Sequence, residues 1–284
     1  MSVIWRLVSA GLVFAFASSC TRTPQAPVTC AAGVSDIYPT SAELPENILR
    51  FYVYFDTPMR PETVWPAISL VNGAGKKIDG VFLANNNDLW SPDRKRLTLL
   101  LDPGRVKTGL DASTSMGRAI TEGGQYGLVV GTDAISNQGC PLKQPYIKSF
   151  IATASDQSVP APLEWVNETP HAGRRDPLKL HLNDIHDHVS LAYRLRVKTL
   201  AGAAVPGRID LAAFETEWHF TPQANWQLGD YVIAVDPTLE DVAGNRPTGL
   251  FDDPTGQGRL NQADASTIFI SFSTQPAEQE VPPE

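Results

Sequence analysis

Cysteines, long apolar runs and catalytic motifs are scarce in this chain, and each shortage excludes a class of protein. Only three cysteines occur among 284 residues, and no pair has the C-x-x-C spacing of a redox site. The mostly apolar run Leu7–Phe16 is far shorter than the roughly 20 residues that a membrane-spanning helix needs. The sequence has no G-x-S-x-G, no H-E-x-x-H and no Gly-rich phosphate loop, so the commonest hydrolase, metalloprotease and nucleotide-binding signatures are missing.

Basic residues are also in the minority, with 23 Lys and Arg against 31 Asp and Glu. Removing the first 19 residues takes away Arg6 and no acid, which leaves a net charge of 22 − 31 = −9. A surface this acidic argues against nucleic acid and anionic lipid headgroups as partners. With 42% hydrophobic and 19% charged residues the composition is globular, and the length suits two domains.

The N-terminus has the layout of a signal peptide over residues 1–19, because small residues follow the short apolar run and precede Cys20. The ASSC ending resembles a bacterial lipobox, which implies that Cys20 is lipidated and that residues 20–33 form a lipidated N-terminus and tether. Acyl chains anchor a protein because each buried methylene adds about 0.8 kcal/mol of membrane affinity. No Asp follows Cys20, so we expect the outer membrane or the cell surface. The alternative is ordinary secretion, with Cys20 incidental.

The other two cysteines, Cys30 and Cys140, are predicted to form a disulfide, because an exported chain folds in an oxidising compartment. Such a bridge closes a loop of roughly 110 residues, worth on the order of 4 to 5 kcal/mol in the chain-entropy model. The alternative is two free thiols.

An internal repeat sets the expected architecture. Residues 51–80 align without a gap on residues 178–207, an offset of 127, and Gly75 falls on Gly202. A repeat of this length indicates one domain type used twice. Each copy carries about seven short apolar runs separated by turn signals, such as the asparagine–glycine pair at Asn72, which is typical of an immunoglobulin-like sandwich.

The sequence therefore predicts an all-β protein of two tandem immunoglobulin-like β-sandwich domains. The first spans residues 34–153 and the second residues 163–274, with a linker at 154–162 and a disordered tail at 275–284. The returning strand of the first hairpin is expected over 77–82. The linker is so short that we expect the two domains to sit end to end with limited freedom.

Two motifs carry a family resemblance. The strand end FDTPM (55–59) and the late turn DVAGN (241–245) resemble the bacterial Ig-like domain of the S-layer (SbsA) type, across roughly residues 34–153 and 163–274. Each copy departs from the pattern, since the first has DAISN (133–137) as its late turn and the second lacks the proline of the early motif. The resemblance implies spacer, stalk or adhesion modules at bacterial surfaces, without a shared ligand.

The segment HLNDIHDH (181–188) is the densest polar cluster, and the first repeat has no histidine. Imidazole and carboxylate suit zinc-like ions, so His186, His188, Asp184 and Asp241 are the candidate metal ligands. The alternative is structural: Asp187 caps a helical turn, and DVAGN is a turn in which Gly244 takes a positive φ. The sequence favours the structural alternative, with no metal and no cofactor.

Partner-binding residues are not determined by the sequence, but three are candidates. Trp65 lies in an expected helical turn, where its ring can either contact a partner or pack in the core. Arg105 and Lys107 give the long connection 102–124 a local positive patch, unless that loop drapes over a sheet edge.

The sequence thus predicts a non-enzymatic envelope lipoprotein whose Ig-like domains act as a spacer, adhesion or protein-binding module. Its expected partners are the membrane, through the N-terminal lipid, and either another envelope protein or a glycan, but not nucleic acid. The alternative is an envelope hydrolase or polysaccharide-binding accessory protein that uses the His/Asp cluster of the second domain. That alternative requires HLNDIHDH to converge in space on acidic residues such as Asp241.

Overall fold

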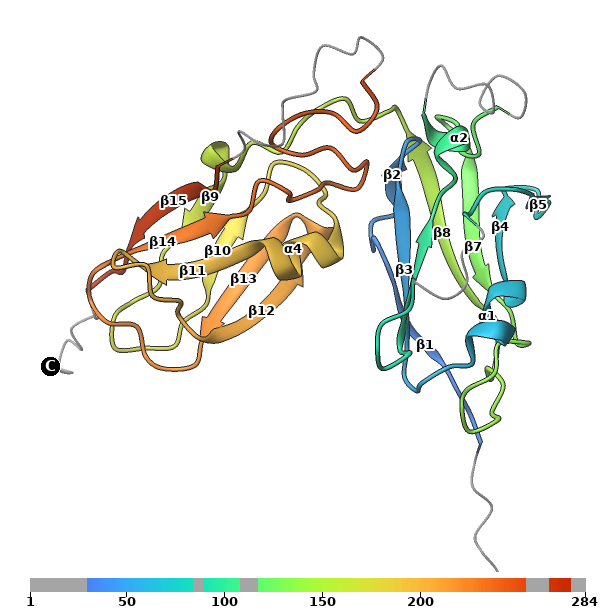
Figure 1. Cartoon of the computed structure of the whole chain (residues 1–284), viewed down its shortest axis with the longest axis horizontal. Coiled ribbons are helices and arrows are strands. Elements are labelled where there is room, and N and C mark those ends of the chain that lie inside the picture. The colour runs from blue at the N-terminus through green and yellow to red at the C-terminus, as the bar shows by residue number, and fades with distance from the viewer. Residues whose placement is uncertain (1–29, 84–88, 108–116, 254–265, 277–284) are drawn as a thin grey trace, which may run out of the picture.

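The structure is a computed structural model that describes residues 30–83, 89–107, 117–253 and 266–276. It consists of two β-sandwiches (Figure 1). The signal peptide, Cys20, the central part of the 102–124 connection and most of the predicted tail lie outside the described residues. No helix in the described ranges is long and apolar enough to cross a membrane.

The first sandwich is made of a three-stranded and a five-stranded sheet, in the orders β1-β3-β6 and β2-β8-β7-β4-β5. Strand β2 runs parallel to β8, and the other pairings are antiparallel. Short helices follow β3 and β6. The elements are β1 (Val34–Tyr38), β2 (Glu43–Pro45), β3 (Arg50–Phe55), α1 (Pro61–Ala67), β4 (Ile68–Asn72), β5 (Lys77–Ile78), β6 (Arg96–Leu100), α2 (Pro103–Val106), β7 (Gln125–Val130) and β8 (Tyr146–Thr153).

The second sandwich has the sheet orders β9-β10-β13-β12 and β11-β14-β15. With its strands lettered A to G in chain order, these are sheets A-B-E-D and C-F-G, the arrangement of constant-type immunoglobulin domains. The all-β, immunoglobulin-like fold class is therefore confirmed. The elements are η1 (Pro162–Glu164), β9 (Val166–Glu168), β10 (Leu178–His181), α4 (His188–Arg194), β11 (Leu195–Thr199), β12 (Gly207–Ala212), η2 (Ala213–Glu215), β13 (Glu217–Pro222), β14 (Asp230–Val235) and β15 (Ile268–Ser273).

The repeat in the sequence has a direct structural counterpart. Helix α4 begins 127 residues after α1 (188 − 61), and β11 begins 127 residues after β4 (195 − 68). The turns that follow place Gly75 and Gly202 at φ values of 75° and 86°, a left-handed conformation that glycine adopts without a steric penalty. The returning strand is shorter than predicted, because β5 ends at Ile78 and Gly80 turns the chain with a positive φ.

Each sandwich has its own hydrophobic core, one built from residues 32–152 and one from residues 165–272. In β3 the side chains of Phe51, Val53 and Phe55 are buried in the first core, as the alternation of a strand requires. Two residues of the second half, Val242 and Ile185, also pack against the first core. A disulfide joins Cys30 to Cys140 and ties the segment before β1 to the loop before β8.

The two sandwiches do not sit end to end, in contrast to the expectation from the short linker. The second sandwich directs the end that carries the start of α4 toward the β1 and β3 side of the first (Figure 1). The linker contains no strand and is held against the first sandwich at Asp156. The backbone N–H of Asp156 donates to the Asn47 side chain at 2.8 Å, and its C=O accepts from the same side chain at 2.9 Å.

Candidate functional site

The junction between the sandwiches is the most elaborate polar site in the described part of the chain. It begins with strand β3, whose alternation turns Arg50, Tyr52 and Tyr54 away from the core. On a free sheet these side chains would face water. Tyr52 is instead only 4% exposed, because the second sandwich covers it.

Asp187 is the central acceptor of this junction. Its carboxylate accepts the Ser190 N–H at 2.8 Å and so caps α4, as the sequence predicts. It also accepts the Tyr52 hydroxyl, at 2.9 and 3.0 Å, and lies 3.6 Å from Arg50 Nε. Burial raises the pKa of Asp187 and the Arg50 guanidinium opposes that rise, so the ion pair offsets part of the cost of desolvation.

Glu240 extends the network at the edge of the junction. One of its oxygens pairs with Arg50 of the first sandwich, and the other accepts two N–H groups of Arg246, at 2.6 and 2.9 Å. A carboxylate between two guanidiniums is well satisfied, and the planar fork of arginine fixes its direction.

A second contact is made by Glu215, which is 3% exposed. Its two oxygens accept the backbone N–H and the hydroxyl of Thr40, both at 2.8 Å. The turn that presents it is strained, since Ala213, Phe214 and Glu215 have φ values of 47°, 58° and 63°. Each left-handed non-glycine residue costs about 1 kcal/mol or more, and the fold retains three in a row where the carboxylate reaches the other domain.

His188 makes the aromatic part of the junction. Its ring stacks on Tyr38 with centroids 3.5 Å apart and meets the ring of Tyr54 edge-on at 5.6 Å. Burial lowers the pKa of His188 to about 4, so the ring is neutral at neutral pH. This residue is therefore part of the contact between the domains and not a ligand beside His186.

The DVAGN turn docks on the first sandwich as well. Asp241 accepts the N–H groups of Ala243 and Asn245 at 2.8 and 2.9 Å, and Gly244 has a φ of 82°, as the sequence predicts for this turn. The carbonyl of Val242 accepts the Leu49 N–H at 2.9 Å. The DVAGN turn is therefore part of the contact between the two sandwiches.

The histidine cluster of the sequence is divided among three places. His186, Asp184 and Asp241 line one cavity, with His186 and Asp241 in an antiparallel bridge, whereas His188 faces the first sandwich. His181 lies on the outer face of β10 beside Glu168 and Glu217, at 2.8 and 3.3 Å. Across the described ranges, no group of three or more His, Cys, Asp or Glu side chains is placed to hold a metal ion.

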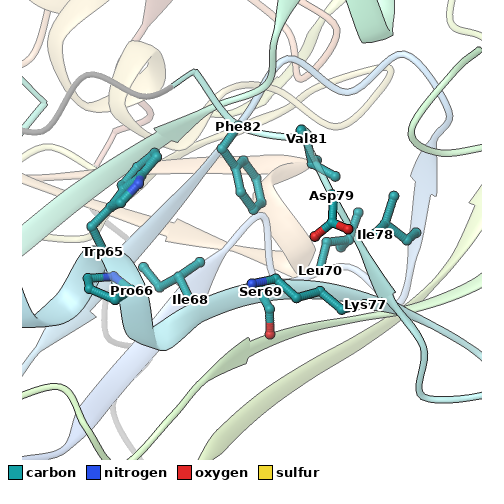
Figure 2. A pocket seen from close by; sticks show the side chains of 11 residues that line it. Trp65, Pro66, Ile68, Ser69, Leu70, Lys77, Ile78, Asp79, Val81 and Phe82 are labelled. Atoms are coloured by element: carbon teal, nitrogen blue, oxygen red, sulfur yellow. The ribbon is translucent and has the colours of Figure 1, made fainter. Parts of the chain in front are cut away.

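Trp65 lies at a separate hollow of about 250 Å³ between α1 and the β4–β5 hairpin (Figure 2). Trp65 and Phe82 stand on its walls, and Lys77 and Asp79 bring one charge of each sign (Figure 2). Trp65 is half-buried and packs against the first core, which is the structural role that the sequence leaves open, and its contact with a partner stays a prediction.

Arg105 and Lys107 do not lie together on the surface as the expected positive patch requires. Arg105 is 7% exposed, and its guanidinium donates to the carbonyl of Asp79 at 3.0 Å. Lys107 places its ammonium 4.0 Å from the ring centre of Phe251, a contact that stabilises the junction through a cation–π interaction. Arg105 is therefore withdrawn from the surface, whereas Lys107 is half-buried and keeps its charge beside Phe251, so it stays a candidate for partner binding.

The residues of the junction carry no motif that identifies them in the sequence. In the sequence, Arg50, Tyr52 and Tyr54 have only the pattern of a strand, and no motif marks Glu215. The available signal was their position, because two tyrosines and one arginine occupy successive outward sites of a strand where charged or small polar side chains are usual. A face of this composition indicates a covered surface.

Comparisons with known proteins give distant likenesses. No protein-family model and no curated protein matches the sequence. Among solved structures, the chain is similar to native alpha-2-macroglobulin from Escherichia coli spanning domains MG0-NIE-MG1, with 15% identity, a TM-score of 0.28, and coverage of 86% of this chain and 71% of that one. The chain is also similar to the S-layer protein rSbsC(31-844), with 12% identity and a TM-score of 0.28. That match covers 72% of this chain and 23% of the S-layer protein, so the chain spans less than a quarter of it. The match to the N-terminal four Ig domains of Dscam1 isoform 6.44 has 10% identity and a TM-score of 0.25, and it covers 84% of this chain and 50% of that one. Likenesses of this size carry no argument about activity or partner, and the fold assignment rests on the strand order.

Proposed function

We propose that this chain is an exported, lipid-anchored envelope protein that acts without catalysis, as a rigid spacer or protein-binding module. Its two Ig-like sandwiches, of the S-layer (SbsA) type in their FDTPM and DVAGN motifs, would hold one fixed orientation at the end of the 20–33 tether. The signal-peptide layout and the lipobox-like ASSC segment support the anchor and a place at the outer membrane or cell surface.

The observation that carries the rigid-module proposal is the three-point contact between the sandwiches. Asp187 with Arg50 and Tyr52, Glu215 with Thr40, and Val242 with Leu49 join the domains at separate places. One contact permits rotation about itself, whereas contacts at three places restrict it. Interfaces between domains otherwise permit relative motion by default, so this amount of buried polar contact indicates selection for a fixed geometry.

The fixed orientation is tested by a distance measurement between spin labels. Lys76→Cys and Ala203→Cys place labels on exposed, equivalent turns of the two sandwiches, while the native disulfide stays oxidised. We expect one narrow distance distribution in the native chain and a broad one after Tyr52→Phe is combined with Arg50→Met. A broad distribution in the native background would show that the sandwiches move independently, and the rigid-module proposal would then fail.

The anchor is tested separately by Cys20→Ala. Wild-type protein is expected in the membrane fraction and the variant in the soluble periplasmic or secreted fraction, with the folded domains unchanged. Equal solubility of the two forms would contradict lipidation and leave the rigid-module proposal untouched.

A second candidate function is supported by the Trp65 hollow alone. Aromatic walls with a few polar groups at the rim suit a sugar ring or a short peptide. Trp65→Ala should reduce retention of the protein on purified cell-wall sacculi, whereas Tyr193→Ala, which removes an aromatic ring that is 63% exposed on the second sandwich, should not. Equal retention of all three proteins would rule out this hollow as the glycan site.

A further inference from the structure

The cavity beside the linker has the features of a ligand site that the junction does not use. It has a volume of about 270 Å³, below the 300 to 1,000 Å³ of typical small-molecule sites, so it suits a small polar molecule or a single side chain. Its walls are the linker residues 158–161 on one side and Glu164, Trp165, Asp184, His186 and Asp241 of the second sandwich on the other.

His186 supplies an unused acceptor to this cavity. The side chain is 1% exposed, and its Nδ1 donates to the carbonyl of Asp184 at 2.8 Å. That bond assigns the proton to Nδ1 and leaves the lone pair on Nε2. Nε2 is buried and has no hydrogen-bond partner in the described part of the chain. Burial lowers the pKa of His186 to about 4, so the lone pair is free at neutral pH.

Trp165 adds an aromatic face and an unused donor. It is 5% exposed, and its ring lies 5.2 Å from that of His186 at an angle of 84°. Its indole N–H, like Nε2 of His186, is buried without a partner among the described residues. Two neighbouring residues that line one cavity thus leave one donor and one acceptor unsatisfied, and a buried polar atom normally has a partner.

The charge around the cavity is negative. Asp184 and Glu164 lie at its exposed rim and Asp241 is buried in its wall, and Asp156 is close enough to act electrostatically on Asp184, His186 and Asp241. None of these four carboxylates forms an ion pair with a lysine or arginine of the described ranges. Burial, followed by the charge of Asp156, raises the pKa of Asp241 to about 8. A positively charged occupant would be attracted to the rim carboxylates and would favour the ionised form of Asp241.

We infer that this cavity binds a primary ammonium group with a hydroxyl beside it, the chemistry of an amino sugar or amino alcohol. The ammonium donates to His186 Nε2 and is held by the rim carboxylates and the Trp165 ring, since cations are attracted to an indole face. The neighbouring hydroxyl accepts the indole N–H. A neutral sugar lacks the charge, and a metal ion cannot satisfy the Trp165 donor.

Three sugars that differ at one position test this inference by calorimetric titration of the full chain. Glucosamine carries the ammonium, N-acetylglucosamine replaces it with an amide and glucose with a hydroxyl. We expect saturable binding of glucosamine, and binding about tenfold or more weaker for the other two, because a hydrogen bond to a charged group is lost with the ammonium. Glucosamine binding should also weaken as salt is added.

Variants locate the site. Asp184→Asn and Glu164→Gln are exposed changes that preserve shape and should each weaken glucosamine binding several-fold, whereas Glu62→Gln removes one exposed charge from the first sandwich and should have no effect. Amide shifts on titration should be confined to residues 158–165 and 183–186 and to the turn at Asp241. Equal binding of the three sugars, no saturation, unchanged affinity in both rim variants, or a preference for Ca²⁺ over glucosamine would each overturn the inference. None of these results bears on the anchor or on the fixed orientation.

Discussion

The hydroxyl of Tyr52 lies 2.9 Å from one carboxylate oxygen of Asp187, so a strand of the first sandwich and the helix cap of the second share one acceptor. The same carboxylate thus caps the start of α4 and joins the two domains. Local structure and domain arrangement are therefore coupled through one side chain.

Tyr52→Phe tests this coupling directly. The change removes the donor and leaves the ring in place, so Asp187 stays buried with one fewer hydrogen bond. We expect the free energy of unfolding to fall by about 1 to 3 kcal/mol, as for a buried charged group that loses a partner. Urea denaturation followed by tryptophan fluorescence measures the change. Tyr193→Phe is the matched control, because that ring is 63% exposed, and a loss of equal size in both variants would contradict the role given to Tyr52.

Stability should also depend on pH through Asp241. Its carboxyl keeps a proton up to about pH 8 in the folded state and loses it near 3.8 when unfolded. The folded chain therefore binds more protons between these values, so the free energy of unfolding falls as pH rises through the window. His186 and His188, with pKa values lowered from 6.5 to about 4, act in the opposite direction below pH 6.5. The contribution of Asp241 is thus clearest between pH 6.5 and 8.

Asp241→Asn isolates that contribution, because the amide oxygen still accepts from Ala243 and Asn245. Between pH 6.5 and 8 the wild type should lose up to about 2 kcal/mol that the variant retains, at roughly 1.4 kcal/mol per pH unit for one proton. Thermal and urea unfolding across this range measure the difference. Asp133→Asn, at an exposed position, should leave the wild-type slope intact, and an unchanged slope in Asp241→Asn would exclude this carboxyl as its source.

The fold was predictable because its signals are local. Alternation in residues 50–55 identifies a strand. The offset of 127 residues places α4 and β11 once α1 and β4 are known. The Asp187 side chain caps α4 by accepting the N–H of Ser190, three residues further along. Each of these is decided within a few residues or by comparison of the two copies.

The junction was not predictable in the same way, because its partners are far apart in sequence. Tyr52 and Asp187 are separated by 135 residues, and Thr40 and Glu215 by 175. Nothing near Arg105 indicates that Asp79 will take up its guanidinium, and nothing near Gly244 indicates the approach of Leu49. Only the outward tyrosines of β3 carried a signal, and their meaning depended on knowing which face the second sandwich covers.

Loss of the disulfide should weaken the first sandwich. Cys30 and Cys140 are separated by 110 residues, so the bridge restricts a large loop in the unfolded chain. Replacing both cysteines with serine should lower the free energy of unfolding by about 4 kcal/mol in the chain-entropy model. Chemical denaturation of the variant, and of wild type with and without reductant, measures this. If reduction shifts the variant's transition as much as that of the wild type, the effect does not come from this bridge.

A substitution at Gly244, on the second sandwich, tests its contact with the first sandwich. A methyl group there would lie 2.5 Å from Leu49 Cδ2 of the first sandwich, at a φ of 82°. Gly173 has a φ of 80° and no atom within 4 Å of the same position, so Gly173→Ala reports the backbone cost alone. Gly244→Ala should be less stable than Gly173→Ala by a further 1 to 3 kcal/mol or so, the usual range for overpacking. A Leu49→Ala background removes this closest contact and leaves Phe251 Cγ at 3.3 Å, so the additional cost of Gly244→Ala should become smaller. Urea denaturation of the four variants measures this, and an undiminished additional cost in the Leu49→Ala background would show that Leu49 is not its source.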